Sequence, residues 1–263
     1  MICHKIGSLD YITAENISAS HCFTTRLGGV SSGYLGTLNL GIRRGDTHEN
    51  VVKNYEILAN ALNFDVNSVV LTHQTHTDII LPVDESHTGA GLFAPELPEC
   101  DGLITNTPGV TLVVFTADCT PILLHDPVTG AVGAVHAGWR GTAAAIAEKA
   151  VRAMVTHYGC CPSDICAAIG PNIKQCCFET DKEVPDALVE ALGETALPHI
   201  LQKGDKYFPD LTAINAAFLR RAGVEKIETS PLCTRCAPDR FWSARVHGNA
   251  RGSQGAIIQR SML

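Results

Sequence analysis

Apolar, β-branched runs alternate along the chain with stretches of helical periodicity, and this alternation constrains the fold more than any other feature. The runs lie at 69–83, 111–119, 121–126, 131–137 and 165–170. Their composition is typical of buried strands, which need cover from helices on at least one face. We therefore expect an α/β or α+β fold with mixed β-sheets flanked by helices. Because no linker-like segment and no repeat interrupts the pattern, residues 1–263 are interpreted as a single domain.

Four segments have the apolar spacing of amphipathic helices. One follows Asp46 and Thr47, a second runs from about Thr142 to about Tyr158, a third covers roughly 181–192, and a fourth begins at the N-cap Asp210 and stops at Gly223. The sequence does not determine the order of the strands between them.

Charge and hydropathy exclude several functional classes. The net charge is −7 and no run of Lys or Arg exceeds two residues, which argues against nucleic acid or an anionic membrane as a partner. No stretch approaches the roughly 18 apolar residues of a spanning helix. The first ten residues, MICHKIGSLD, lack the apolar core of a signal peptide. A cytoplasmic location is therefore expected.

The chain contains 11 cysteines, and their arrangement argues against a disulfide framework. Their number is odd, and adjacent pairs occur at 160–161 and 176–177. Most are expected to be small buried apolar residues. The C-x-x-C at 233–236 has the spacing of a zinc or redox pair, but no second C-x-x-C occurs, so a structural role is favoured.

Metal-capable side chains lie at three strand-like runs. Cys119 ends the run at 111–119, His136 lies near the end of 131–137, and His73 and His76 lie within 69–83. On a regular strand, residues three apart face opposite sides, so only one of these last two histidines should join the others. One cysteine and two histidines would form a catalytic type of zinc site, with a fourth position open. The thiolate favours zinc over magnesium or calcium.

A series of motifs also occurs in a fixed order. The motifs are LNLGIRRGD, QTH, CDGLIT, TADCTPILLHDP, AVHAGWRGT, IGPNIKQCCFE, DLTAINAAFLRRAGV and CTRC followed by FWSAR. Together they resemble the bacterial YfiH-type family, also labelled polyphenol oxidase or laccase-domain proteins and now regarded as purine nucleoside phosphorylases. The resemblance covers about residues 23–258. It implies zinc bound by His76, Cys119 and His136, and thus chooses His76 over His73.

The resemblance implies a zinc-dependent enzyme in which the three metal ligands are also the catalytic residues. Its expected reaction converts adenosine, inosine or guanosine and phosphate into free base and ribose 1-phosphate. Related proteins are also credited with adenosine deamination and with phosphorolysis of methylthioadenosine. The predicted substrate contacts are Arg140, four residues after His136, and Arg245, which matches an arginine of the family's FxSYRR motif.

The chain departs from the family pattern near these contacts. Thr77 stands where glycine often follows the ligand histidine, and Val246 replaces the second arginine of FxSYRR. The late Gly-Arg pair is Gly252-Ser253, with Arg251 displaced. These departures leave the metal ligands in place and concern substrate binding near the C-terminus.

Several other interpretations bear on the same residues. The 11 histidines include no H-x-H and no H-C-H, which excludes multicopper laccase chemistry, although copper could replace zinc adventitiously.

A cysteine hydrolase with Cys119 as nucleophile and His136 or His76 as base stays open as an alternative function. Related proteins are connected with removal of faulty peptidoglycan precursors. A non-enzymatic, zinc-stabilised partner-binding domain stays open as well. Asp118 either orients a zinc ligand or serves the turn.

Overall fold

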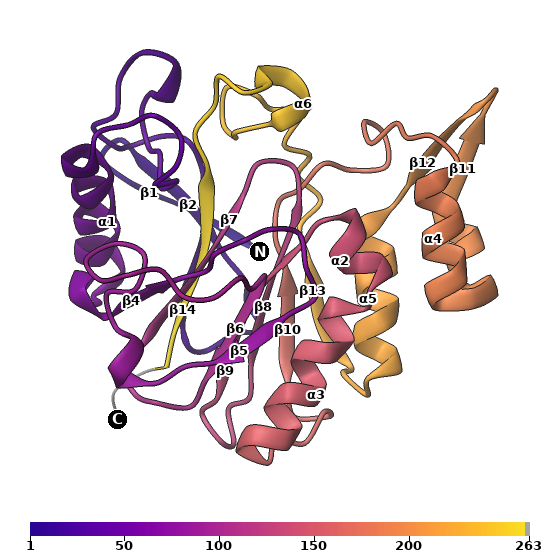
Figure 1. Ribbon diagram of the computed structural model, residues 1–263, viewed down its shortest axis with the longest axis horizontal. Helices are drawn as coiled ribbons and strands as arrows, with labels where there is room; N and C mark the ends of the chain where they lie inside the picture. The colour runs from indigo at the N-terminus through magenta and orange to yellow at the C-terminus, as the bar shows by residue number, and fades with distance from the viewer. Residues whose placement is uncertain (261–263) are drawn as a thin grey trace.

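The computed structural model describes residues 1–260, and its strands form two mixed six-stranded sheets and a separate hairpin (Figure 1). The first sheet has the spatial order β1 (Ile2–Ile6), β2 (Leu9–Thr13), β3 (Ser20–Thr24), β14 (Gln254–Gln259), β7 (Thr111–Thr116) and β4 (Val69–Leu71). The second has the order β13 (Lys226–Thr229), β10 (Cys166–Ile169), β8 (Thr120–His125), β9 (Val132–Ala137), β6 (Gly102–Thr105) and β5 (Ile80–Pro82). The hairpin consists of β11 (Ile200–Lys203) and β12 (Lys206–Pro209). The pairs β4–β7, β5–β6 and β10–β13 are parallel and the other pairs are antiparallel.

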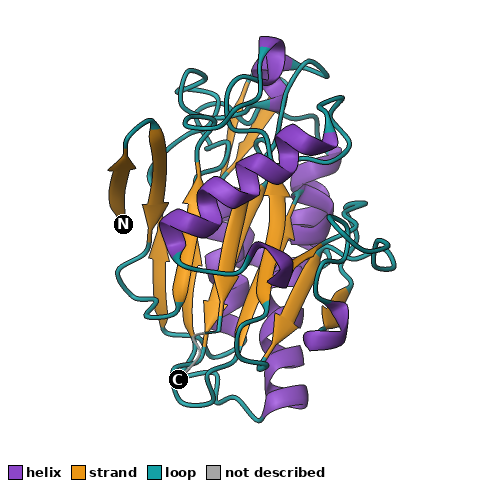
Figure 2. Cartoon of the chain, turned by 90° about the vertical axis from the view of Figure 1, so that its left-hand side faces the viewer, coloured by secondary structure: helices purple, strands orange, loops and turns teal. Residues whose placement is uncertain are grey.

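Three of the helices within residues 1–260 cover the outer faces of the two sheets. The helices are α1 (His48–Leu62), α2 (Trp139–Ala143), α3 (Ile146–Tyr158), α4 (Glu183–Leu192), α5 (Leu211–Arg221) and α6 (Ala244–His247). Helix α1 lies across the first sheet, in front of its strands in Figure 2, and α3 and α5 pack against the second sheet on the other side of the molecule. The result is a four-layered arrangement of helix, sheet, sheet and helix.

The alternation of side chains along each strand explains these layers. Leu112 and Val114 of β7 point into the core between the sheets, whereas Val113 packs toward α1. On β8, Leu123 points into the same inner core and Leu124 packs toward α3 and α5. Because both faces of each sheet are covered, the central strands contain consecutive apolar residues rather than an apolar residue at every second position.

The expected mixed α/β fold is confirmed, and so are three of the four expected helices as continuous elements. Helix α1 begins after Thr47, whose side chain accepts a hydrogen bond from Asn50 N, and α5 begins after Asp210, which accepts one from Ala213 N. The helix expected from about Thr142 is instead divided into α2 and α3. Ala145 has a left-handed backbone (φ 58°) there, which continuous helix does not allow.

The strand expected over 69–83 is wrong. Residues 69–71 belong to the first sheet and 80–82 to the second, so the segment between them crosses from one sheet to the other as a loop. The run 111–119 behaves similarly, because β7 ends at Thr116 in the first sheet and β8 begins at Thr120 in the second. Apolar composition alone does not reveal such a change of sheet. Within residues 1–260, no helix is long and apolar enough to cross a membrane.

Candidate metal centre

Two crossings between the sheets and the end of β9 bring three side chains together. His76 lies in the loop between β4 and β5, and Cys119 lies in the short turn between β7 and β8. His136 lies on β9, paired in register with Pro121 of β8, two residues from Cys119. Cys119 is therefore a turn residue and not the last residue of a strand. The three side chains come from separate segments that only the sheet pairing places side by side.

The three potential ligand atoms lie within 4.8 Å of one another. Cys119 Sγ is 3.8 Å from His76 Nε2, and the rings of His76 and His136 meet nearly at right angles with centroids 5.0 Å apart. His136 is buried, Cys119 is half-buried and His76 is exposed. The group thus extends from the protein interior to the surface and leaves one side open to a ligand.

A buried carboxylate, Asp101, orients both histidines. Its Oδ1 accepts hydrogen bonds from His136 Nδ1 at 2.7 Å and from His76 N at 3.1 Å. Its Oδ2 accepts from Thr75 N at 3.2 Å, from Thr77 N at 2.7 Å and from Thr77 Oγ1 at 2.8 Å. With Nδ1 engaged by the carboxylate, the atom of His136 left for a metal is Nε2. Carboxylate–histidine pairs of this kind fix the tautomer and ring orientation of metal ligands.

The backbone conformation at His76 and Gly138 allows the three side chains to approach one another. His76 has a positive φ of 65°, which holds the loop in the tight turn that wraps around Asp101. Gly138, directly after β9, makes the close approach possible, because a Cβ there would lie 2.8 Å from His76 Cδ2 and 3.4 Å from Cys119 Sγ. A side chain at this position would push against both potential ligands.

The electrostatics of the group favour a thiolate beside an imidazolium in the metal-free protein. Burial alone would raise the pKa of Cys119, but the positive charge of His136 and hydrogen bonds from both histidines outweigh it and lower the pKa to about 6. Burial alone would lower the pKa of His136, but the charge of Cys119 and the bond to Asp101 raise it to about 9. Burial opposes ionisation of Asp101 as well, yet bonding to His136 and Thr77 lowers the pKa of that carboxyl.

The other residues singled out from the sequence lie outside this group. The Nε2 atom of His73 is 3.1 Å from Arg43 Nη1, so His73 belongs to a separate polar cluster. Arg140 is exposed on α2, with its guanidinium 4.2 Å from the ring centroid of Trp139. Arg245 is exposed on α6, where its Nη2 donates to Glu179 O at 3.1 Å.

Asp118 supports the turn rather than a histidine. Its carboxylate accepts hydrogen bonds from Thr234 Oγ1 at 2.6 Å, Ser243 Oγ at 3.0 Å and Arg245 N at 2.7 Å. Sequence reasoning missed the orienting role of Asp101. The available signal was its place in CDGLIT, where a lone carboxylate directly precedes an apolar strand.

These features define a mixed α/β protein with an open His-Cys-His centre held by a buried carboxylate. The sequence profile of the family described as "Multi-copper polyphenol oxidoreductase laccase" matches residues 20–261. The purine nucleoside phosphorylase YlmD of Geobacillus stearothermophilus is 40% identical over 240 residues, covering 89% of this chain and 86% of the relative. The purine nucleoside phosphorylase of Deinococcus radiodurans is 37% identical over 251 residues, covering 95% and 92%.

The fold agrees with this relationship. The crystal structure of YlmD from Geobacillus stearothermophilus superposes with a TM-score of 0.93 at 36% identity, covering 98% of each chain. The chain therefore belongs to the laccase-like, YfiH-type family. The expected resemblance is confirmed.

Proposed function

We propose that this protein is a zinc-dependent purine nucleoside phosphorylase whose metal ligands are His76, Cys119 and His136. The observation that carries the proposal is the convergence of these three donors with one side open, in a chain whose relatives bear the name of that activity. The proposed substrates are adenosine, inosine or guanosine together with phosphate. Adenosine deamination and methylthioadenosine phosphorolysis are proposed as further reactions of the same centre.

The donor set fits zinc on chemical grounds. One thiolate and two imidazoles are typical zinc ligands, and three protein ligands are the pattern of catalytic zinc sites. The proton on His136 Nδ1 is held by Asp101, so Nε2 is the atom that would bind a metal, once the second ring proton of the imidazolium has passed to solvent. When bound, zinc would supply a Lewis acid that stabilises negative charge and lowers the pKa of water.

The phosphate and ribose contacts are proposed on cationic side chains of a cavity beside the loop that carries His76. A cavity of about 280 Å³ is lined by Arg43, Arg44 and Phe115, by residues 72–74 of the loop that carries His76, and by Glu96, which pairs with Arg43. Burial lowers the pKa of Arg44, and its Nε donates to Ser253 Oγ at 3.2 Å. Arg44 is half-buried and Arg43 is exposed, and guanidinium groups bind phosphate through paired donors. Arg140 and Arg245 stay proposed as further contacts.

The test is a nucleoside panel assayed with and without phosphate, with the released bases separated by chromatography. Phosphate-dependent release of hypoxanthine from inosine, lost in Cys119→Ala, supports the proposal. Release that does not depend on phosphate, or an unchanged rate in Cys119→Ala, would contradict it. Arg140→Ala and Arg245→Ala are expected to raise KM for phosphate or nucleoside, and Arg152→Ala on the exposed face of α3 is the control.

One observation favours a second candidate, a cysteine hydrolase. The low pKa of Cys119, about 6, and the adjacent His136 provide a thiolate and an acid in the metal-free protein. Zinc would occupy the same sulfur, so the two functions respond oppositely to metal. A hydrolase would gain activity when zinc is removed, whereas the phosphorylase would lose it.

A further inference from the structure

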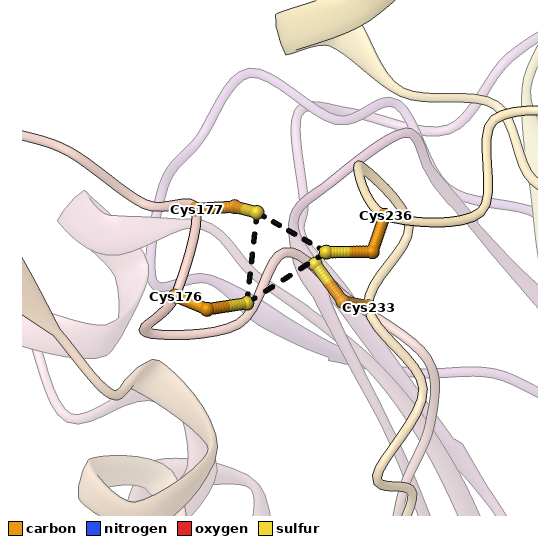
Figure 3. A group of neighbouring side chains, drawn as sticks. All are labelled: Cys176, Cys177, Cys233 and Cys236. Atoms are coloured by element: carbon orange, nitrogen blue, oxygen red, sulfur yellow. Dashed lines mark hydrogen bonds between the residues drawn. The ribbon is translucent and has the colours of Figure 1, made fainter.

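A second group of metal-capable side chains lies outside the centre described above. Cys176 and Cys177 follow β10 on one loop, and Cys233 and Cys236 lie on the loop after β13. Figure 3 shows the two pairs facing each other with their sulfur atoms turned inward. All four sulfur atoms lie within 4.8 Å of one another. The partner for the C-x-x-C is thus an adjacent pair, which a search for a second C-x-x-C cannot find.

The spacing of the sulfur atoms suits a single ion. Cys177 Sγ is 3.3 Å from Cys236 Sγ and 3.5 Å from Cys176 Sγ, and Cys176 Sγ is 3.8 Å from Cys236 Sγ. Tetrahedral zinc with bonds of ~2.3 Å places its sulfur ligands roughly 3.8 Å apart. A disulfide would require a separation of about 2.05 Å, and all four residues are free cysteines.

Ordinary burial does not account for the group. Cys177 and Cys233 are buried, but Cys176 and Cys236 are exposed. Free cysteines are usually retained as small buried apolar residues, and two exposed thiols beside two buried ones do not fit that role. Four thiols aimed at one point at the protein surface are better explained by a shared ligand.

Hydrogen-bond donors surround the sulfur atoms. Lys174 N donates to Cys233 Sγ at 3.4 Å, and Arg235 Nη1 donates to Cys177 Sγ at 3.4 Å. Donors and a guanidinium at this position stabilise negative charge on sulfur. A divalent ion with four thiolates carries two net negative charges, which Arg235 partly balances, and the four thiol protons pass to solvent on binding.

We propose that Cys176, Cys177, Cys233 and Cys236 bind a structural zinc ion, distinct from the His-Cys-His centre. Its four sulfur ligands close the coordination shell, which is the pattern of structural rather than catalytic zinc. The ion joins the loop after β10 to the loop after β13.

Both joined loops contact the turn that carries Cys119. Thr234, next to Cys233, donates to Asp118 Oδ1 at 2.6 Å, and Ile173 N donates to Asp118 O at 2.9 Å. The proposed ion therefore stabilises the two loops that hold the turn of Cys119, without contacting the His-Cys-His centre itself. Removal of the ion is expected to lower the melting temperature. It should weaken zinc binding at Cys119 only indirectly, through the loosened turn.

The test measures zinc and iron by elemental analysis in the full chain. We expect about two zinc ions per wild-type chain and about one in the His76→Ala/Cys119→Ala variant, with the remaining ion in an all-sulfur shell at ~2.3 Å by X-ray absorption. Cys233→Ser/Cys236→Ser should lose about one zinc. The matched control is Cys161→Ser, an exposed cysteine outside both groups, which should lose none. Zinc-free His76→Ala/Cys119→Ala protein, or iron in place of zinc, would overturn the proposal.

Thiol labelling of the wild-type protein tests the same site without any substitution. Cys3 and Cys161 are exposed and should be alkylated at once, whereas Cys176 and Cys236, which are also exposed, should react only after a chelator removes zinc. Immediate alkylation of Cys176 and Cys236 would refute the proposal. Protection released by a reductant but not by a chelator would also refute it, because that result identifies a disulfide.

Discussion

Replacement of Asp101 by asparagine should disable the His-Cys-His centre while leaving its ligands in place. The carboxylate accepts bonds from His136 Nδ1 and His76 N on one oxygen and from three donors of Thr75 and Thr77 on the other. An asparagine retains one acceptor oxygen and presents an amide group with two donors. The oxygen should stay on the side with three donors, which turns the amide nitrogen toward His136.

That orientation changes the histidine tautomer. An amide that donates to His136 Nδ1 makes this atom an acceptor and moves the ring proton to Nε2, the atom needed for metal. Loss of such supporting contacts costs about 10- to 100-fold in metal affinity, or about 1.4–2.7 kcal/mol. The N–H of His76 would also lose its acceptor, which should lower the free energy of unfolding by about 1–3 kcal/mol.

Zinc affinity can be measured by competition with a chromophoric chelator, with circular dichroism to verify the fold. The matched control is Asp126→Asn, because Asp126 is also a buried carboxylate that accepts backbone bonds, from Val128 N at 2.8 Å and Thr129 N at 3.3 Å. It follows β8 at the end opposite to Cys119, so its replacement should leave zinc affinity unchanged. Wild-type zinc affinity in Asp101→Asn would refute the proposed role of the carboxylate.

Three further predictions concern the ligands and the buried histidines. His76→Ala should lose zinc from the first centre and His73→Ala should retain it, because His73 lies against Arg43; equal loss in two folded variants by elemental analysis would contradict this ligand set. Cys119→Ala should abolish phosphate-dependent hypoxanthine release with an unchanged circular dichroism spectrum, and retained turnover would exclude the proposed centre. Burial lowers the pKa of His21 and His125, so the unfolded chain binds more protons below about pH 6.5. The free energy of unfolding should therefore fall as pH drops from about 7 to about 5, by at most about 1.4 kcal/mol per pH unit for each histidine. Urea titrations at several pH values give this pH dependence of the free energy of unfolding, which should be weaker in His125→Gln. An unchanged pH dependence in that variant would contradict the assignment to His125.

Local patterns in the sequence were sufficient to predict elements whose stability depends on near neighbours. The N-caps Thr47 and Asp210 bind donors three residues away, so the starts of α1 and α5 can be recognised from the sequence. The break at Ala145 could not be recognised, because alanine favours helix and no residue type there indicates the left-handed backbone that the structure shows.

Contrary to expectation, His73 and His76 do not lie on opposite faces of a strand. These residues lie on a loop and not on a strand, so alternation of faces does not apply. The structure nevertheless places only His76 beside Cys119 and His136, because the loop wraps around Asp101. The role of His76, Cys119 and His136 as metal ligands stays a prediction.

The fold class, most helix positions and the residue types able to bind a soft metal ion could all be predicted from the sequence. Those properties follow from side-chain chemistry and from periodicity over a few residues. Which of these residues come into contact depends on the tertiary structure. Cys119 and His136 come together through the pairing of β8 with β9, and Cys177 meets Cys236 across 59 residues of chain. Such contacts depend on which strands pair and where the chain changes sheet, and both are set by burial of the whole core rather than by any local segment.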